Sequence, residues 1–192
     1  MHLRLRHETP PEWVARVEAD VVAFLQDHAA NERRVSRAAL TLAVQHPERR
    51  ELVAALIDVS IEELEHFRLV HRLLEDRGAT LAQDSPDPYM KRLHRALSHS
   101  DRDTWLRRRL VLSAVVEARG YERFALLGER LEDTALRATY RELARSEARH
   151  KGLYLRLARH YFAARVVAAD LDAILDLEAD VIASRPLGPT LH

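Results

Sequence analysis

Residues that end helices are scarce in this chain, and their scarcity limits what it can fold into. Only 5 glycines and 7 prolines occur among 192 residues, which leaves little turn chemistry for strands and hairpins. Between the breaks, apolar residues recur with helical spacing over long stretches. The sequence therefore predicts a few long helices in an all-α fold.

The breaks divide the chain into five expected helices. Thr9 is expected to cap the first helix, with Glu12 completing a capping box. Asp103 and Asp133 are expected to cap the third and fourth helices, and Gly78 is expected to end the second. The expected helices cover approximately residues 9–45, 46–77, 103–131, 133–162 and 171–184, and residues 79–102 form a long crossover with a short amphipathic piece at 89–97.

These elements favour a bundle over a continuous coiled coil, because caps and breaks interrupt the pattern and apolar positions spread widely around each helix. We therefore expect one four-helix domain over residues 1–192, with the long crossover between helices 2 and 3, an extra C-terminal helix and a tail at about 185–192. A chain of this length can bury a sizeable core.

Composition excludes several classes of protein. The formal net charge is 0, so no global field indicates a nucleic-acid or membrane partner. Cysteine is absent, which excludes disulfides and thiolate metal sites. The segment Met1–Arg6 is too short and polar for a signal peptide, and no apolar run approaches the roughly 18 residues of a membrane helix. We expect a cytoplasmic protein with no membrane segment.

Two Glu-x-x-His motifs, Glu63–His66 and Glu147–His150, carry the chemistry of the chain. Residues at i and i+3 share one face of a helix, so both side chains of a motif can reach one metal ion. Glu32 lies 31 residues before Glu63, and Glu117 lies 30 residues before Glu147. The two sets are offset by 84 to 85 residues, which indicates an internal duplication of a helical hairpin.

Hairpin geometry brings these residues to one level. About 14 to 17 residues separate each of them from the turn of its hairpin, so antiparallel helices place the two glutamates side by side. Burying four carboxylates and two histidines without a cation would be costly, and donors without sulfur suit iron or manganese better than structural zinc. We predict a two-metal site of the ferritin-like kind, with the ligands Glu32, Glu63, His66, Glu117, Glu147 and His150.

Neighbouring residues allow weaker predictions. Glu122 lies roughly 140° around the helix from Glu117, so we expect it outside the site, paired with an arginine. His28 lies one turn before Glu32 on the same face. It either hydrogen-bonds that ligand or is an ordinary core histidine.

Several segments resemble a known family. Residues Ile61–Leu81, Val116–Leu127 and Ser146–Tyr161 are similar to the bacterial tRNA hydroxylases that act on 2-methylthio-isopentenyl-adenosine, and His28–Glu32 resembles the first-helix motif of that family. The resemblance spans approximately residues 10–183 and matches the family's iron ligands at all six predicted positions.

The resemblance implies a non-haem diiron monooxygenase that hydroxylates the isopentenyl group of this nucleoside next to the tRNA anticodon. It implies two iron ions, O2 and an external electron donor or reductase. Two features depart from the family pattern and concern the substrate. Gly120-Tyr121 stands where the family has Ser-Cys, and the tail Pro186–His192 lacks the family's basic ending.

Binding of tRNA requires a basic surface. In a bundle with one long crossover, helices 2 and 3 run parallel and therefore begin at the same end of the bundle. Arg156 and Arg159, near the end of helix 4, fall at that end too. The predicted docking face therefore comprises Arg49, Arg50, Arg107, Arg108 and Arg109. The other interpretation is a solvated cluster neutralised by Glu48, Glu51, Asp101 and Asp103.

Other functions stay open from the residues alone. A bacterioferritin-like iron storage protein has a similar ligand pattern but would assemble into a large cage. A diiron oxygenase with another substrate would use the same site. A rubrerythrin-like peroxidase normally carries cysteine-bound iron, and the absence of cysteine argues against it. A plain bundle would bind no metal.

Overall fold

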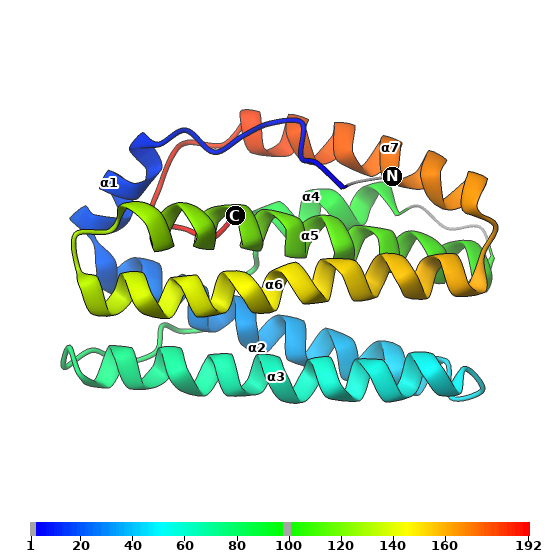
Figure 1. The fold of residues 1–192 in the computed structure, drawn as a ribbon, viewed down its shortest axis with the longest axis horizontal. Coiled ribbons are helices and arrows are strands. Elements are labelled where there is room, and N and C mark those ends of the chain that lie inside the picture. Colours follow the sequence, from blue (N-terminus) through cyan, green and yellow to red (C-terminus); the bar gives the residue numbers. More distant parts are fainter. Residues whose placement is uncertain (1–2, 98–100) are drawn as a thin grey trace. The chain divides into compact units, whose positions relative to one another are not determined.

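The computed structural model describes residues 3–97 and 101–192 of the chain. Within these residues all regular secondary structure is helical (Figure 1). Residues 98–100, which belong to the predicted crossover, lie outside the described part. The helices are α1 (Glu12–Ala19), α2 (Val21–Gln45), α3 (Arg50–Glu75), α4 (Pro88–Ala96), α5 (Arg102–Arg130), α6 (Thr134–Tyr161) and α7 (Ala164–Ala183).

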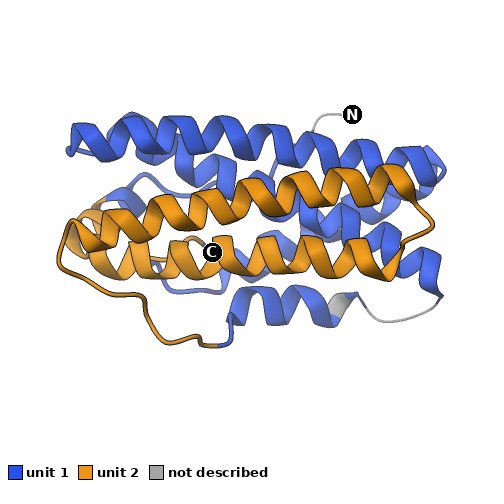
Figure 2. Ribbon diagram, turned by 90° about the horizontal axis from the view of Figure 1, so that it is seen from below, with its two compact units in different colours: residues 1–14, 86–187, 192 blue, residues 15–85, 188–191 orange. Residues whose placement is uncertain are grey.

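The chain divides into two compact units, which Figure 2 shows in different colours. Unit 1 comprises residues 1–14, 86–187 and 192, and unit 2 comprises residues 15–85 and 188–191. In unit 1, α5 packs against α6, and α7 packs against α4, α5 and α6. In unit 2, α2 packs against α3. Each unit therefore contains one of the two predicted helical hairpins. A single domain over residues 1–192 stays a prediction.

In unit 2 the helix ends follow local chemistry. The carboxylate of Asp20 accepts a hydrogen bond from the Ala23 amide and caps α2. The helix predicted over residues 9–45 is therefore split into α1 and α2. Gly78 has a positive φ of 65° just after α3, and the Ala79 amide bonds back to the carbonyl of Leu74. The predicted stop at Gly78 is confirmed, because this backbone conformation suits glycine.

In unit 1 three aspartates cap three helices. Asp87 caps α4, which confirms the amphipathic piece predicted in the crossover, and Asp133 caps α6 as predicted. The prediction that Asp103 caps α5 is wrong, because Asp101 accepts the hydrogen bond from the Thr104 amide. Helix α7 begins at Ala164, seven residues earlier than predicted, and its first turns bury Val167.

The two hairpins bury small and apolar residues where their helices meet. In unit 2, the carbonyl and hydroxyl of Ser60 on α3 bond to the hydroxyl of Ser36 on α2. In unit 1, a Cβ added at Gly128 of α5 would lie 2.8 Å from Cγ of Arg141 and 3.2 Å from its backbone nitrogen. Gly128 therefore permits the close approach of α5 and α6. Of the helices in the described ranges 3–97 and 101–192, none combines the length and the apolarity that a membrane span requires.

A buried arginine connects α5 to α7 and to the N-terminal segment. Arg119 is fully buried and makes a two-pronged contact with Glu178 of α7, with N–O distances of 2.8 and 3.0 Å. Its remaining N–H groups donate to the carbonyl of His7, the hydroxyl of Thr9 and the carboxylate of Glu122. All five guanidinium N–H groups therefore have acceptors. This network ties α5, α7 and the N-terminal segment together within unit 1.

Thr9 belongs to this network and does not cap a helix. Its amide and hydroxyl both donate to the Glu122 carboxylate, at 2.6 and 2.7 Å, and α1 begins only at Glu12. The predicted capping box is therefore wrong, since tertiary contacts take the side chain that would have capped α1. The prediction that Glu122 pairs with an arginine is confirmed by its contact with Arg119.

The C-terminal residues make specific contacts. The His192 ring stacks on Tyr89 of unit 1, with ring centroids 4.5 Å apart and an angle of 2° between the planes. Within unit 2, the Leu191 amide donates to the Asp27 carboxylate at 2.7 Å. Both terminal residues are buried. The segment predicted as a tail therefore ends in packed residues.

Candidate metal centre

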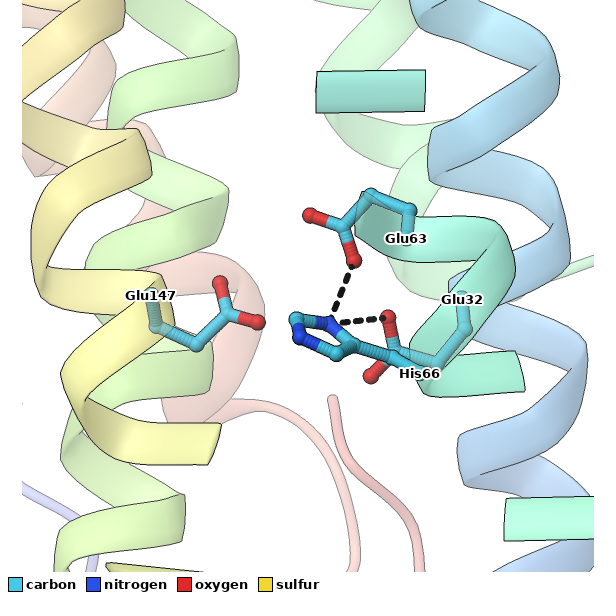
Figure 3. A group of neighbouring side chains, drawn as sticks. All are labelled: Glu32, Glu63, His66 and Glu147. Atoms are coloured by element: carbon cyan, nitrogen blue, oxygen red, sulfur yellow. Dashed lines mark hydrogen bonds and ion pairs between the residues drawn. The ribbon is translucent and has the colours of Figure 1, made fainter. Parts of the chain in front are cut away.

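In unit 2, three of the predicted ligands lie together. Glu32 of α2 and Glu63 and His66 of α3 each offer a ligand atom, and these atoms lie within 4.8 Å of one another. Nδ1 of His66 lies 3.1 Å from Oε2 of Glu63 and 3.8 Å from Oε2 of Glu32, as Figure 3 shows. Both glutamates are buried. Helical spacing and hairpin register thus bring these donors to one place.

His28 contacts a predicted ligand directly. Its Nε2 lies 2.5 Å from Oε1 of Glu32, one helical turn away, and its ring is fully buried. Burial alone would raise the pKa of Glu32. The charge and the hydrogen bond of His28 outweigh burial and hold this pKa well below its usual range. Of the two interpretations of His28, the structure supports the hydrogen-bond partner of Glu32.

The charge of His66 depends on both carboxylates. Burial lowers the pKa of His66, but its close contact with Glu32 and its hydrogen bond to Glu63 outweigh burial and raise this pKa to about 10. Without a metal ion, protonated His66 therefore supplies the positive charge between the two carboxylates. A metal ion would have to displace this proton, since a histidine ligand binds as the neutral ring.

This shift predicts how the stability of metal-free protein depends on pH. The folded-state pKa of about 10 lies above the ordinary value of 6.5, so protonated His66 stabilises the fold fully below about pH 6.5. That stability is lost as pH rises from about 6.5 to about 10, on the order of a few kcal/mol. Urea unfolding of metal-free protein across this range should show the loss.

The matched control for this prediction is another histidine of α3. His66→Gln should flatten the decline of stability with pH, whereas His71→Gln should leave it in place, because His71 lies in an exposed pair with Glu75. An equal decline in wild type and His66→Gln would show that another group causes the pH dependence.

In unit 1, the other three predicted ligands also lie together. Glu117 of α5 and Glu147 and His150 of α6 offer ligand atoms within 4.8 Å of one another, and all three residues are buried. A Cβ added at Gly120 would lie 3.6 Å from the carboxyl carbon of Glu147. A side chain at position 120 would therefore be in ordinary van der Waals contact with this carboxylate.

Sequence reasoning did not predict the cation–π contact beside this group. The ammonium of Lys151 lies 3.9 Å from the centre of the Tyr121 ring. Lys151 follows His150, and Tyr121 lies one turn after Glu117. The motif spacing carried no signal for this contact, because Lys151 and Tyr121 lie on different helices and neither belongs to the ligand pattern.

The two groups have the same donors, two carboxylates and one imidazole in each unit. Buried carboxylates are destabilising unless a cation or hydrogen-bond donors compensate them. Oxygen and nitrogen donors without sulfur suit iron and manganese. The residues present therefore fit a metal ion in each unit on the chemistry of the donor set.

Helical architecture and these donors define a protein of the ferritin-like class. A solved structure from Synechococcus, described as protein 43 with aldehyde deformylating oxygenase activity, is similar to this chain. It matches with a TM-score of 0.92 and 30% identity, over 99% of this chain and 96% of that one. This match confirms the predicted fold class.

A comparison with protein families assigns the chain more narrowly than the fold does. A family model described as tRNA-(MS[2]IO[6]A)-hydroxylase (MiaE) matches residues 1–192, and the chain belongs to this family. This result confirms the resemblance noted in the sequence.

Two relatives carry the name tRNA 2-(methylsulfanyl)-N(6)-isopentenyladenosine(37) hydroxylase. The one from Pseudomonas putida is 34% identical over 176 residues, which cover 92% of this chain and 85% of the relative. The one from Salmonella typhimurium is 32% identical over 90% of this chain, and the chain spans 63% of that longer relative.

Proposed function

We propose that this chain is a non-haem diiron monooxygenase that hydroxylates the isopentenyl group of 2-methylthio-isopentenyl-adenosine next to the tRNA anticodon. The observation that carries the proposal is the family match over residues 1–192. The Glu–Glu–His groups of the two units supply the donors that such chemistry requires. A tRNA substrate also supports the predicted cytoplasmic location.

We further infer that the six predicted residues hold two iron ions. Support comes from the identical donor sets of the two units and from the offset of 84 to 85 residues between them. The ligands of this proposal are Glu32, Glu63, His66, Glu117, Glu147 and His150. His28 would hold Glu32 in place through its 2.5 Å contact.

Bound iron would supply the activation of O2. Hydroxylation replaces one C–H bond of the isopentenyl group by C–OH, and the second oxygen atom leaves as water with two electrons and two protons. An external reductase or other donor must provide the electrons, since the sequence contains no flavin or nicotinamide motif. The four carboxylates of the two groups are buried, so bulk water has little access to them.

The docking face for tRNA stays a prediction from the sequence. The predicted face consists of Arg49, Arg50, Arg107, Arg108 and Arg109. In unit 1, Arg107 and Arg108 both donate to Asp170 of α7, at 2.7 and 3.3 Å. Arg107 also lies over the ring of Phe162. Because Asp170 neutralises part of their charge, we expect Arg107 and Arg108 to contribute little to tRNA affinity.

The decisive experiment supplies iron-loaded, reduced protein with O2 and tRNA that carries the isopentenyl modification. Mass spectrometry of the nucleosides should show one added oxygen atom on the modified adenosine. Transfer RNA with unmodified adenosine is the negative control. Absence of product, with reductant and O2 both present, would contradict the proposed substrate.

A second substrate class is favoured by the structural match. The similar Synechococcus protein is described as having aldehyde deformylating oxygenase activity. The same reaction mixture with a long-chain aldehyde in place of tRNA therefore tests for a diiron oxygenase with another substrate. Iron storage is not favoured, because the family and both relatives are named as hydroxylases.

A further inference from the structure

Helix α6 is strongly basic in a chain that is neutral overall. The chain has 30 basic and 30 acidic residues. Helix α6 carries six arginines and Lys151, and its only acidic residues are Glu142 and the buried Glu147. A local excess of this size is the electrostatic footprint of a polyanion partner.

The arginines form one continuous stripe. At about 100° per residue, all six fall within about 120° of one another around the helix. The stripe extends for about 33 Å along the helix, at 1.5 Å per residue. Glu147 and His150 lie roughly 140° to 160° from its centre. The α6 arginine stripe consists of Arg137, Arg141, Arg145, Arg149, Arg156 and Arg159.

Carboxylates neutralise little of the charge of Arg141, Arg145, Arg156 and Arg159. Arg156 and Arg159 are exposed and have no acidic partner in the described part of the chain. Arg141 donates to the carbonyl of Gly128. Arg145 pairs with Glu142 through a salt bridge in which both side chains are well exposed. The stripe therefore differs from Arg107 and Arg108, which share the half-buried Asp170.

Small residues separate the arginines along the stripe. Ala138, Ala148 and Gly152 lie between them on the same face. Glycine weakens a helix interior, and packing does not explain Gly152. A Cβ there would meet only the guanidinium of Arg156, at 3.4 Å. Leu155, at the edge of this face, is buried. A strip whose exposed positions between the arginines carry small side chains suits a sugar–phosphate backbone, which must come close to a row of guanidinium groups.

We propose that the α6 arginine stripe binds the sugar–phosphate backbone of tRNA. This inference rests on the proposed function and replaces the predicted docking face as the main source of affinity, although Arg156 and Arg159 of the stripe were predicted to lie near that face. The stripe faces away from Glu147 and His150. It therefore holds the RNA without taking part in the reaction, and its loss should raise KM and leave kcat unchanged.

The test uses the iron-loaded full chain. The variant Arg145→Gln/Arg156→Gln/Arg159→Gln removes three charges that make no hydrogen bond to the backbone. The control variant removes three exposed arginines of unit 2, by Arg37→Gln, Arg68→Gln and Arg72→Gln. Fluorescence anisotropy with labelled tRNA measures the Kd of each protein at several salt concentrations.

We expect the stripe variant to bind tRNA at least about tenfold more weakly than wild type, and the control within about twofold of it. The slope of log K against log salt should become shallower by about 2 to 3, for three lost phosphate contacts. Iron content and kcat at saturating tRNA should equal those of wild type.

Three outcomes would overturn the proposal. Equal tRNA affinity in the stripe variant would show that another surface binds the RNA, and the hydroxylation assay would still decide the proposed function. Failure of wild type to bind tRNA would remove the partner itself. The stripe variant could also bind tRNA as tightly as wild type and turn over with a chemical reductant but not with an acidic electron-transfer protein. That result would assign the stripe to the electron donor. Stripe-dependent binding without hydroxylation would uphold the stripe and contradict the function.

Discussion

Changing Glu147 to alanine is expected to reduce bound iron and to lower the rate of tRNA hydroxylation at least about 100-fold. Loss of a residue that merely supports a ligand costs 10- to 100-fold in metal affinity or activity, so loss of a proposed ligand should exceed this range. Glu147 is buried in unit 1, and its carboxylate lies within 4.8 Å of ligand atoms of Glu117 and His150. Iron analysis of purified protein and single-turnover assays measure the two effects.

The same substitution should stabilise the metal-free protein. The carboxylates of Glu147 and Glu117 lie within 4.8 Å of one another, and two like charges at this distance repel, so Glu147→Ala is expected to raise the free energy of unfolding when no metal is present. Glu142→Ala is the matched control, because Glu142 lies on the exposed face of the same helix. It should leave iron content, rate and stability unchanged. Full iron content and rate in Glu147→Ala would contradict its role as a ligand.

Helix ends were predictable where the signal is local. Gly78 and Asp133 act within one turn of the residues they stop or cap, so their types and positions suffice. Thr9 has the residue type of a cap, but its partners are Glu122 and Arg119, more than 100 residues away. No local pattern reports such contacts, and the predicted first helix was therefore wrong at its start.

The grouping of the proposed ligands was the most predictable part of the site. Spacing of i and i+3 places Glu63 with His66 and Glu147 with His150, and the register of each hairpin adds the third residue of each group. The neutralisation of charge in the predicted docking face was less predictable. Asp170 pairs with Arg107 and Arg108 from more than 60 residues away, and the predicted fifth helix began one residue after it.

The contact between Arg119 and Glu178 could not be predicted from spacing either, and it should contribute strongly to stability. Glu178→Leu is expected to lower the free energy of unfolding by about 3 to 5 kcal/mol, because it removes the fully buried carboxylate that accepts two of the five guanidinium N–H groups of Arg119. Both side chains are fully buried, and Tyr89 adds a hydrogen bond to Glu178 at 3.3 Å. Urea unfolding monitored by circular dichroism measures the change.

Two further variants separate the ion pair from general packing. Arg119→Met/Glu178→Leu removes both charges and should be less destabilised than Glu178→Leu alone, since the Arg119 guanidinium is no longer buried without the carboxylate of Glu178. Glu142→Ala breaks the exposed pair with Arg145 and should change stability by no more than about 0.5 kcal/mol. If the double variant were as unstable as the single one, lost packing of Glu178 would explain the effect. The network would then support α5 through shape and not through charge.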